Sequence, residues 1–496
     1  MTLFSPPEDW KKVSKMFTTQ KLFSLRRVST PTLLLLAILF STSVNAENLD
    51  DLMDGFDDAL ATMVKEVKKT SATTVEDDLM EGFDDEGTPS DKAKPLASAQ
   101  TKEGKLVGVL GDFTGKVTEQ LAYSYRGDAP HDNLSSVKSS LLLDYEHKFE
   151  NGFKFKVNGK AYYDAIYSLR GRSKYSSDEL SELESEVELY DAYVEGSLAD
   201  NVDVKLGRQV VVWGRSDTIR VTDVLNPLDN RRPGMVDIED LRLPVGMAKL
   251  DYFVGDWRIT PMALFEQRFS KNPPSGSAFN TNPRAIPSNE DYSDVTPALS
   301  IGGEFSGWDV NFYAAKIRDD AGYFSNGKMH HDKVDMVGTA INVLKGSWLL
   351  KSELAHFDGL KYSSTPDKEF RRTDALVGLE YNGFADTMVS YDVALKKIHS
   401  YDARLKNEPM GYEKNSYQHA FRVSKDFMNA TVKANYLLSL FGESADKGGF
   451  QRVWVKYDIA DGIYTNVGLV DYMGGSTRFD AVKNNDMFFA DVTYSF

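Results

Sequence analysis

Charged residues that could line a pore are concentrated in one stretch of the chain, residues 214–245. Apolar residues such as Leu225, Leu228 and Ile238 are interspersed among them. A connection of this length is usually functional or disordered, and its regular apolar content favours a structured loop. If this stretch lines a pore, guanidinium and carboxylate groups on opposite sides of that pore would set a transverse electric field across it. The candidate pore residues in and just before this stretch are Trp213, Arg215, Asp217, Asn226, Arg231, Arg232, Glu239 and Asp240.

The alternative for this stretch is an external cap held together by its own ion pairs.

Catalysis has little support elsewhere in the sequence. The chain has no cysteine, which excludes a thiol nucleophile, a disulfide framework and a thiolate metal site. The nearest catalytic candidates are His330, His331 and Asp332, but no nucleophile motif accompanies them. We therefore expect no catalytic residue, no metal and no cofactor. The net charge of −16 also argues against nucleic-acid binding.

The N-terminal residues have the features of an export signal. An apolar run, LLLLAILF at residues 33–40, follows basic residues and precedes small residues that end at Ala46. This order is typical of a secretory signal peptide. The run is too short to cross a bilayer as a helix, which takes about 20 residues. We predict that residues 1–46 are the signal peptide and that Met1 or Met16 is the initiator.

Residues 47–103 are polar and acidic and contain a repeated motif. DLMDGFDD begins at Asp51, and DLMEGFDD begins 27 residues later. The segment has too little apolar surface to fold by itself, so we expect it to be disordered in the periplasm. Each copy still carries a small apolar set ringed by carboxylates, which is typical of a motif that docks into a partner's groove. The predicted docking residues are Leu52, Met53, Phe56, Leu79, Met80 and Phe83.

Two other interpretations of this segment stay open. It could be a plain solvated spacer, although two nearly identical copies argue against that. It could also bind calcium, but the carboxylate spacing does not match an EF-hand loop.

From residue 104 to the C-terminus, apolar and polar residues alternate. Phe153, Phe155 and Val157 share one face of a predicted strand, and Lys154 and Lys156 share the other. A sustained period of two is typical of a barrel strand with lipid outside and water inside. The 24 Tyr and 28 Phe also suit strands and membrane interfaces. We therefore predict an all-β fold, a transmembrane antiparallel β-barrel over residues 104–496.

The predicted strands are joined alternately by tight turns and long polar loops. This is the asymmetry expected of periplasmic turns and external loops. Counting from about Val117 gives eighteen strands, with sixteen as the alternative because residues 106–113 and 334–344 are ambiguous. One strand, residues 202–213, leads into the charged stretch. The tight turns are predicted at residues 150–152, 199–201, 255–256, 306–307, 345–346, 382–383, 426–427 and 461–462.

The chain ends in an amphipathic segment, MFFADVTYSF. Tyr494 and Phe496 lie on its apolar face. A last strand that ends in Phe resembles the signal read by the barrel-assembly machinery. Together with the export signal, it predicts a protein of the Gram-negative outer membrane, in contact with outer-membrane lipids, with its N-terminal segment in the periplasm.

Residues 207–247 carry a family resemblance in three pieces: GRQVVVWGRSD, DVLNPLDNRRPG and EDLRLPVGM. They resemble a family of uncharacterised proteobacterial outer-membrane barrels, domain of unknown function 1302. Genes of that family often stand beside an RND exporter of the MMPL type and a periplasmic protein similar to lipoprotein-sorting factors. The resemblance implies a barrel that works with such an exporter and a periplasmic partner to move lipid-like or hydrophobic molecules. It assigns no catalytic residues.

Two alternatives accompany this function. The barrel could be a stand-alone porin, either for general diffusion or for a specific small solute. A hydrolase at the barrel rim, based on His331, has less support. A TonB-dependent transporter is disfavoured because the residues after Gly104 are too few for a plug domain and the 22 strands of that class.

Overall fold

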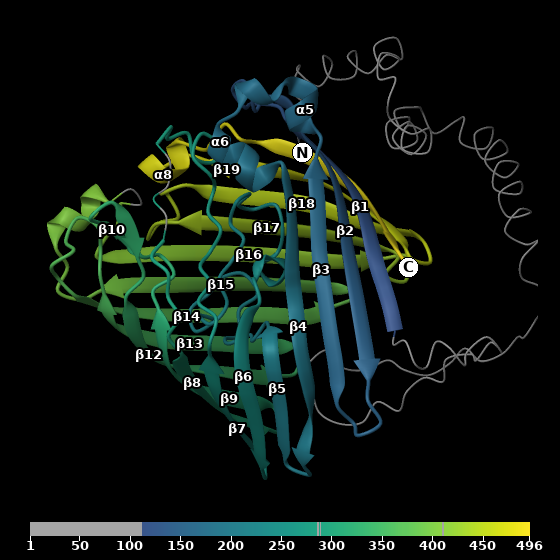
Figure 1. Cartoon of the computed structure of the whole chain (residues 1–496), viewed down its shortest axis with the longest axis vertical. Helices are drawn as coiled ribbons and strands as arrows, with labels where there is room; N and C mark the ends of the chain where they lie inside the picture. Colours follow the sequence, from purple (N-terminus) through teal and green to yellow (C-terminus); the bar gives the residue numbers. More distant parts are fainter. Residues whose placement is uncertain (1–111, 285–286, 288, 409–410) are drawn as a thin grey trace, which may run out of the picture. The chain divides into compact units, whose positions relative to one another are not determined.

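The computed structural model describes residues 112–284, 287, 289–408 and 411–496. The predicted signal peptide and the repeated motif lie outside these residues. Within the described residues, eighteen antiparallel strands form one sheet (Figure 1). The sheet is closed because β1 pairs with β2 on one side and with β20 on the other. The prediction of an all-β antiparallel barrel is confirmed, with eighteen strands rather than sixteen.

The first half of the barrel contains nine strands. They are β1 (Asp112–Ser124), β2 (Asn133–Lys148), β3 (Lys154–Asp164), β4 (Ser185–Ala199), β5 (Val202–Gln209), β6 (Val245–Val254), β7 (Trp257–Leu264), β8 (Thr296–Phe305) and β9 (Trp308–Arg318). The second half contains β12 (Lys333–Lys345), β13 (Trp348–Leu360), β14 (Phe370–Phe384), β15 (Thr387–Ile398), β16 (Asn415–Phe427), β17 (Val432–Phe441), β18 (Gly449–Ala460), β19 (Ile463–Met473) and β20 (Met487–Ser495).

Short strands and helices lie in the connections between the barrel strands. A hairpin of β10 (Tyr323–Ser325) and β11 (Lys328–His330) lies between β9 and β12. The helices are α5 (Ile166–Arg170), η3 (Arg172–Lys174), α6 (Ser177–Leu183), α7 (Ile238–Leu241), η4 (Ala403–Asn407) and α8 (Thr477–Asp480). None of the helices in the described part of the chain is long and apolar enough to cross a membrane.

Six of the eight predicted tight turns lie where the sequence placed them. Two predictions were wrong, because β14 continues to Phe384 and β16 continues to Phe427. The chain reverses instead at Asp386 and at the run that begins with Met428, where non-glycine residues adopt positive φ angles. The glycine at position 383 therefore marked a residue within a strand, not the reversal.

The outer face of the barrel is apolar. Large side chains at alternate strand positions stay exposed, among them Val337, Leu354 and Val377, which is 53% exposed. A broad exposed apolar surface is unfavourable in water, whereas a closed barrel leaves no unpaired strand edge in lipid. The exterior therefore fits the hydrocarbon region of a membrane.

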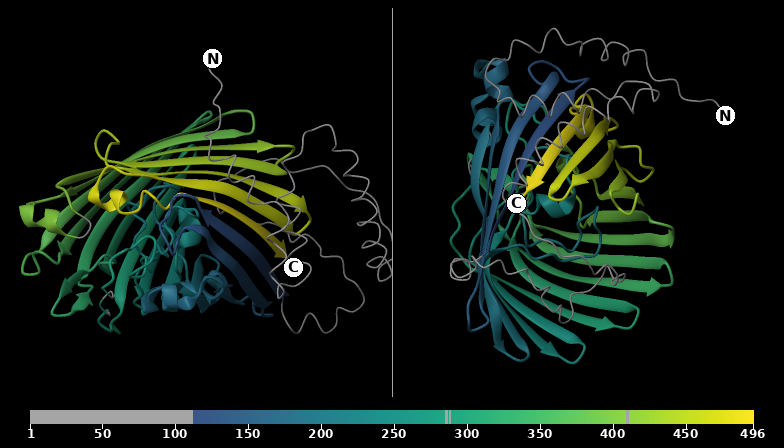
Figure 2. Two further views of the ribbon diagram at one scale, coloured as in Figure 1. Left: turned by 90° about the horizontal axis from the view of Figure 1, so that it is seen from above. Right: turned by 90° about the vertical axis from the view of Figure 1, so that its right-hand side faces the viewer.

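The last residue extends the ladder that closes the cylinder. Gly115 and Phe496 exchange two backbone hydrogen bonds, of 2.9 and 3.0 Å. The C-terminal strand thus lies beside the first one, as Figure 2 shows for the yellow and blue ribbons. Tyr494 and Phe496, the predicted assembly residues, are about half exposed on the outer face.

Candidate functional site: the loop inside the barrel

The connection between β5 and β6, residues 210–244, will be called the inner loop. Its chain leaves the sheet at Gln209, four residues earlier than predicted. The cause is Asn226, whose buried side chain replaces the ladder partners. Its Oδ1 accepts from the Val211 amide at 2.8 Å, and its Nδ2 donates to the carbonyl of Leu243 at 2.9 Å. One amide side chain thereby joins the two ends of the loop.

The first part of the inner loop packs on the apolar half of the inner wall. Trp213 is 3% exposed and stacks on Tyr313 of β9, with ring centroids 4.6 Å apart. Ile219, Val221 and Leu225 belong to the same buried cluster as wall residues of strands β6 to β16. A small cavity of about 30 Å³ lies between this part and strands β6 to β9. Apolar side chains of the loop and the wall therefore occupy much of this side of the lumen.

Two wall carboxylates anchor the same part of the loop. Glu353 of β13 accepts four hydrogen bonds, from the amides of Arg215, Ser216 and Thr222 and from the Thr222 hydroxyl, at 2.6 to 3.0 Å. Asp392 of β15 accepts from the hydroxyls of Ser216 and Thr218 at 2.5 and 2.8 Å. Glu353 and Asp392 are each 3% exposed, so their charges depend on these donors.

Ion pairs add to this anchoring. Arg215 pairs with Asp309 of β9. Asp217 lies 3.2 Å from Lys351 of β13, which also lies 2.8 Å from Glu380 of β14.

The middle of the inner loop is attached to β3 and β4. Arg231 lies 2.6 Å from both Asp229 and Glu186, and Arg232 lies 2.9 Å from Asp164. Burial alone would lower the pKa of Arg231, but its hydrogen bonds to Asp229 outweigh burial and raise it. Both arginines are therefore permanent cations in ion pairs.

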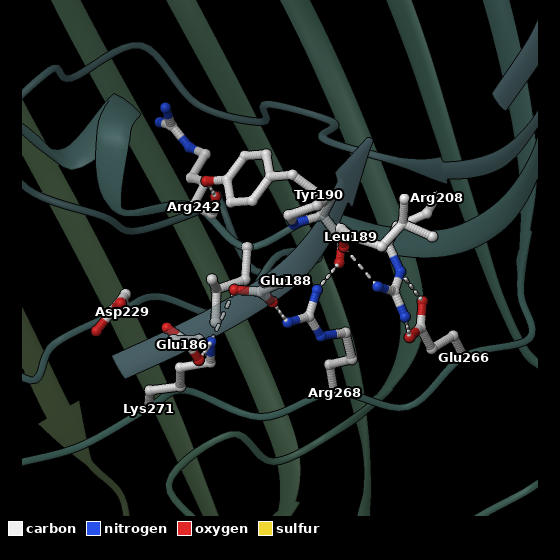
Figure 3. A network of polar contacts seen from close by, with 12 residues as sticks. Glu186, Glu188, Leu189, Tyr190, Arg208, Asp229, Arg242, Glu266, Arg268 and Lys271 are labelled. Carbon is white, nitrogen blue, oxygen red and sulfur yellow. Dashed lines mark hydrogen bonds and ion pairs between the residues drawn. The ribbon is translucent and has the colours of Figure 1, made fainter. Parts of the chain in front are cut away.

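A larger network joins β4 to the external segment after β7. Figure 3 shows Glu186 and Glu188 of β4 directed toward Lys271 and Arg268. Lys271 lies 2.6 Å from Glu186 and 2.8 Å from Glu188. The backbone amide of Lys271 also donates to the carbonyl of Leu228 at 2.9 Å. The inner loop and the external segment are thus fixed to the same strand.

The far end of the inner loop reaches a third sector of the wall. Asp237 lies 3.4 Å from Arg422 of β16 and 3.1 Å from Arg452 of β18. The Tyr472 hydroxyl of β19 donates to the carbonyl of Pro233. A single loop therefore contacts β3 and β4, then β9, β13 and β15, and also β16, β18 and β19. Contacts with such distant strands place it across the lumen.

Helix α7, at this far end, presents two exposed acids. Partial desolvation by the surrounding wall raises the pKa of Glu239, and the charges of Asp240 and Asp237 add to the effect. Partial desolvation and Asp237 likewise raise the pKa of Asp240, against an opposing effect of Lys160, Arg452 and Lys116. The acidic tip of the loop therefore lies within the electrostatic reach of basic residues on β1, β3 and β18.

The eight residues predicted from the sequence fall into three groups. Trp213, Asn226 and Arg231 are buried and hold the loop in place; Arg215 and Arg232 are partly buried in ion pairs; Asp217, Glu239 and Asp240 are accessible. Their role in conduction stays a prediction. The anchors Glu353, Lys351 and Asp392 were not singled out from the sequence. The alternation of their strands indicates that they face inward but does not identify what they contact.

The histidine cluster is part of the external loops. His331 is buried and stacks on Phe269, with ring centroids 3.5 Å apart. Its Nδ1 contacts the Asp319 carbonyl at 2.7 Å, and its Nε2 contacts the Asn289 side chain at 3.1 Å. Both ring nitrogens are thus occupied, which leaves neither free to activate a nucleophile. Among the described residues, no group of three or more histidines and carboxylates could hold a metal ion.

Comparison with known proteins gives a family and a set of distant barrels. The model of a family described as "Protein of unknown function (DUF1302)" matches residues 120–496. No curated protein matches the chain. Among solved structures, OccK8 (OprE) of Pseudomonas aeruginosa is 10% identical over 77% of this chain and 97% of that chain, with a TM-score of 0.47. OccAB3 of Acinetobacter baumannii is 10% identical over 77% and 98%, with a TM-score of 0.48.

OpdK of Pseudomonas aeruginosa, in a structure with vanillate, is 9% identical over 78% of this chain and 98% of that chain, with a TM-score of 0.47.

Proposed function

The chain belongs to the DUF1302 family, and from its barrel we propose that it is an outer-membrane transport protein whose inner loop forms the constriction. One observation carries the proposal: the inner loop is bound to distant sectors of the wall, by Arg231 to β4, by Glu353 to β13 and by Asp237 to β18. A loop held in this way narrows the lumen instead of capping it from outside.

We place the solute path on the polar side of the inner loop. The side that faces β6 to β15 is filled by the apolar cluster around Trp213 and Met336. Asp240 of α7 instead lies within the electrostatic reach of Lys116 and Lys160. Acid on the loop and base on the wall give a constriction with a transverse field, which suits a charged or amphiphilic solute.

Ion selectivity in planar bilayers tests this proposal. Replacing Glu239 with Gln together with Asp240 with Asn removes the acidic side of the constriction. The reversal potential in a KCl gradient should then shift toward anion preference. Glu150→Gln, in a periplasmic turn, is the matched control and should behave as the wild type. If the double variant keeps wild-type selectivity and conductance, α7 does not line the path.

The same measurement has a pH dependence. Because partial desolvation and neighbouring acids raise the pKa values of Glu239 and Asp240, these groups lose their charge at a higher pH than ordinary carboxyls do. The wild type should therefore move toward anion preference as the pH falls from neutral, and the double variant should move less. An equal response of both proteins would assign the titration to other groups.

A second candidate function is the outer-membrane station of an exporter system for lipid-like molecules. The two copies of the DLM(D/E)GFDD motif favour it, because they suit docking to a periplasmic partner or to an RND exporter of the MMPL type. Deleting residues 47–102 should abolish co-purification with that partner. The barrel should still assemble, since β1 begins at Asp112. A truncated protein that still co-purifies would contradict docking through this segment.

We assign no enzymatic role to the protein. A hydrolase at the rim would need His331, whose burial and stacking instead suit a structural part of the external loops. Loss of lipid hydrolysis in a His331→Ala variant would overturn this assignment.

A further inference from the structure

Three lysines follow one another along the inner wall beside the acidic tip of the inner loop. The lysine row is defined as Lys116 of β1, Lys138 of β2 and Lys160 of β3. Each occupies an inward position of its strand. Asp164, at an even position of β3 like Lys160, binds Arg232 of the inner loop, and Val117, next to Lys116, is exposed on the outer face.

The strand register brings two of these lysines to one level. Leu142 of β2 lies opposite Lys116 on one side and opposite Lys160 on the other. Since neighbouring strands are about 4.8 Å apart, the two lysine backbones are about 10 Å apart, with Leu142 between them. Flexible side chains of that length can bring both ammonium groups onto one oxyanion.

Lys138 lies at a different level of the pore, further along β2. It occupies the inward position of β2 four residues before Leu142, which places it about 13 Å along the strand. The Tyr162 ring lies 5.3 Å from its Nζ. An aromatic ring and the apolar Leu142 therefore lie beside the lysines on this part of the wall.

The lysine row also differs from neighbouring lysines in its lack of paired acids. Lys154 lies 2.6 Å from Glu195, and Lys156 lies 3.0 Å from Asp144. Among the described residues, no carboxylate lies within 4.0 Å of the amino groups of the lysine row. The ammonium groups of Lys116 and Lys160 can therefore bind an anionic solute, because no existing ion pair has to be broken first.

We propose that Lys116 and Lys160 of the lysine row bind the anionic group of the transported solute, and that Leu142 contacts its aliphatic part. The ligand class is an organic anion with one carboxylate or similar oxyanion and a short hydrocarbon chain. The acids of α7 on the other side of the path would repel this anion and direct it toward the lysines. The inference rests on the proposed transport function and names its substrate class.

Block of the channel current by hexanoate tests the inference. Hexanoate should reduce the wild-type current, whereas hexanamide, its neutral isostere, should not. Replacing Lys116 and Lys160 together with Gln should weaken the block about fivefold, the effect of losing two solvated cation contacts. Lys345→Gln, at a periplasmic turn, should leave the block unchanged. Equal block of the double variant and the wild type, or equal block by hexanamide, would overturn the inference.

A binding measurement separates this inference from the proposed function. Saturation-transfer NMR on the full-length protein in detergent reports hexanoate binding whether or not the barrel conducts. A conducting barrel that does not bind hexanoate would overturn the lysine row and leave the transport function intact. A barrel that binds hexanoate through Lys116 and Lys160 but does not conduct would support the binding site and contradict the transport function.

Discussion

His331 illustrates how one residue can hold the external loops together. Its ring is stacked on Phe269 of the segment after β7, and it contacts Asp319 and Asn289. Burial lowers the pKa of this imidazole from its ordinary value of 6.5. The packed loops therefore favour the neutral ring.

Acidification should loosen these loops. In the opened loops His331 takes up a proton near pH 6.5, whereas in the packed loops it does so only at lower pH. The free energy of opening the loops is therefore largest above pH 6.5 and decreases as the pH falls below this value. Hydrogen exchange of residues 319–332 should be faster at pH 5 than at pH 7 after correction for intrinsic rates. In a His331→Asn variant this extra acceleration should disappear; if it persists, another group is responsible.

At the residue scale, sequence alternation predicted which side chains face inward but not what they contact. Arg231 and Arg232 stood out as members of a charged loop. In the structure Arg231 pairs with Asp229 and Glu186, and Arg232 pairs with Asp164. Glu353 was one polar residue among many on alternating strands. Its role depends on amides of residues 215–222, more than 130 positions earlier in the chain.

At the element scale, the inner loop owes its position to buried carboxylates. Replacing Glu353 with Ala would leave the amides of Arg215, Ser216 and Thr222 without their acceptor. Each unpaired buried donor costs about 1–3 kcal/mol, so this part of the loop should detach from β13. Hydrogen exchange of residues 215–222 should rise, and open-channel noise should increase.

A matched variant separates this effect from simple loss of charge. Glu443→Gln removes an exposed carboxylate from the connection between β17 and β18 and should change neither measurement. If Glu353→Ala also leaves the exchange of residues 215–222 unchanged, the anchoring role of Glu353 is wrong.

The strand elements were well predicted because each shows its own period of two. Errors arose where side chains replaced backbone partners or where unusual residues formed the turn. Asn226 ended β5 at Gln209, and Asp386 formed a reversal that Gly383 had suggested three residues earlier. The effect of Asn226 has no local signal, since its partners come from both ends of a long loop.

At the scale of the whole molecule, the ladder between β1 and β20 closes the barrel, and the last residue extends that ladder by one pair. Phe496 exchanges two backbone hydrogen bonds with Gly115, and its ring lies against that glycine. Deleting Phe496 should remove these bonds together with the predicted assembly signal, and should strongly reduce the folded, heat-modifiable band in washed outer membranes. Met428→Ala, an exposed change in a periplasmic turn, is the control. Normal assembly without Phe496 would contradict both roles.

The cross-lumen attachment of the inner loop has a mechanical consequence. A hollow cylinder of eighteen strands can flatten under lateral pressure from the surrounding lipids, and flattening would change the width of any passage through it. The inner loop acts as an internal brace, because its ties to β4, β13 and β18 resist separation of these sectors. The bore of this barrel should accordingly be insensitive to membrane tension as long as those ties remain intact.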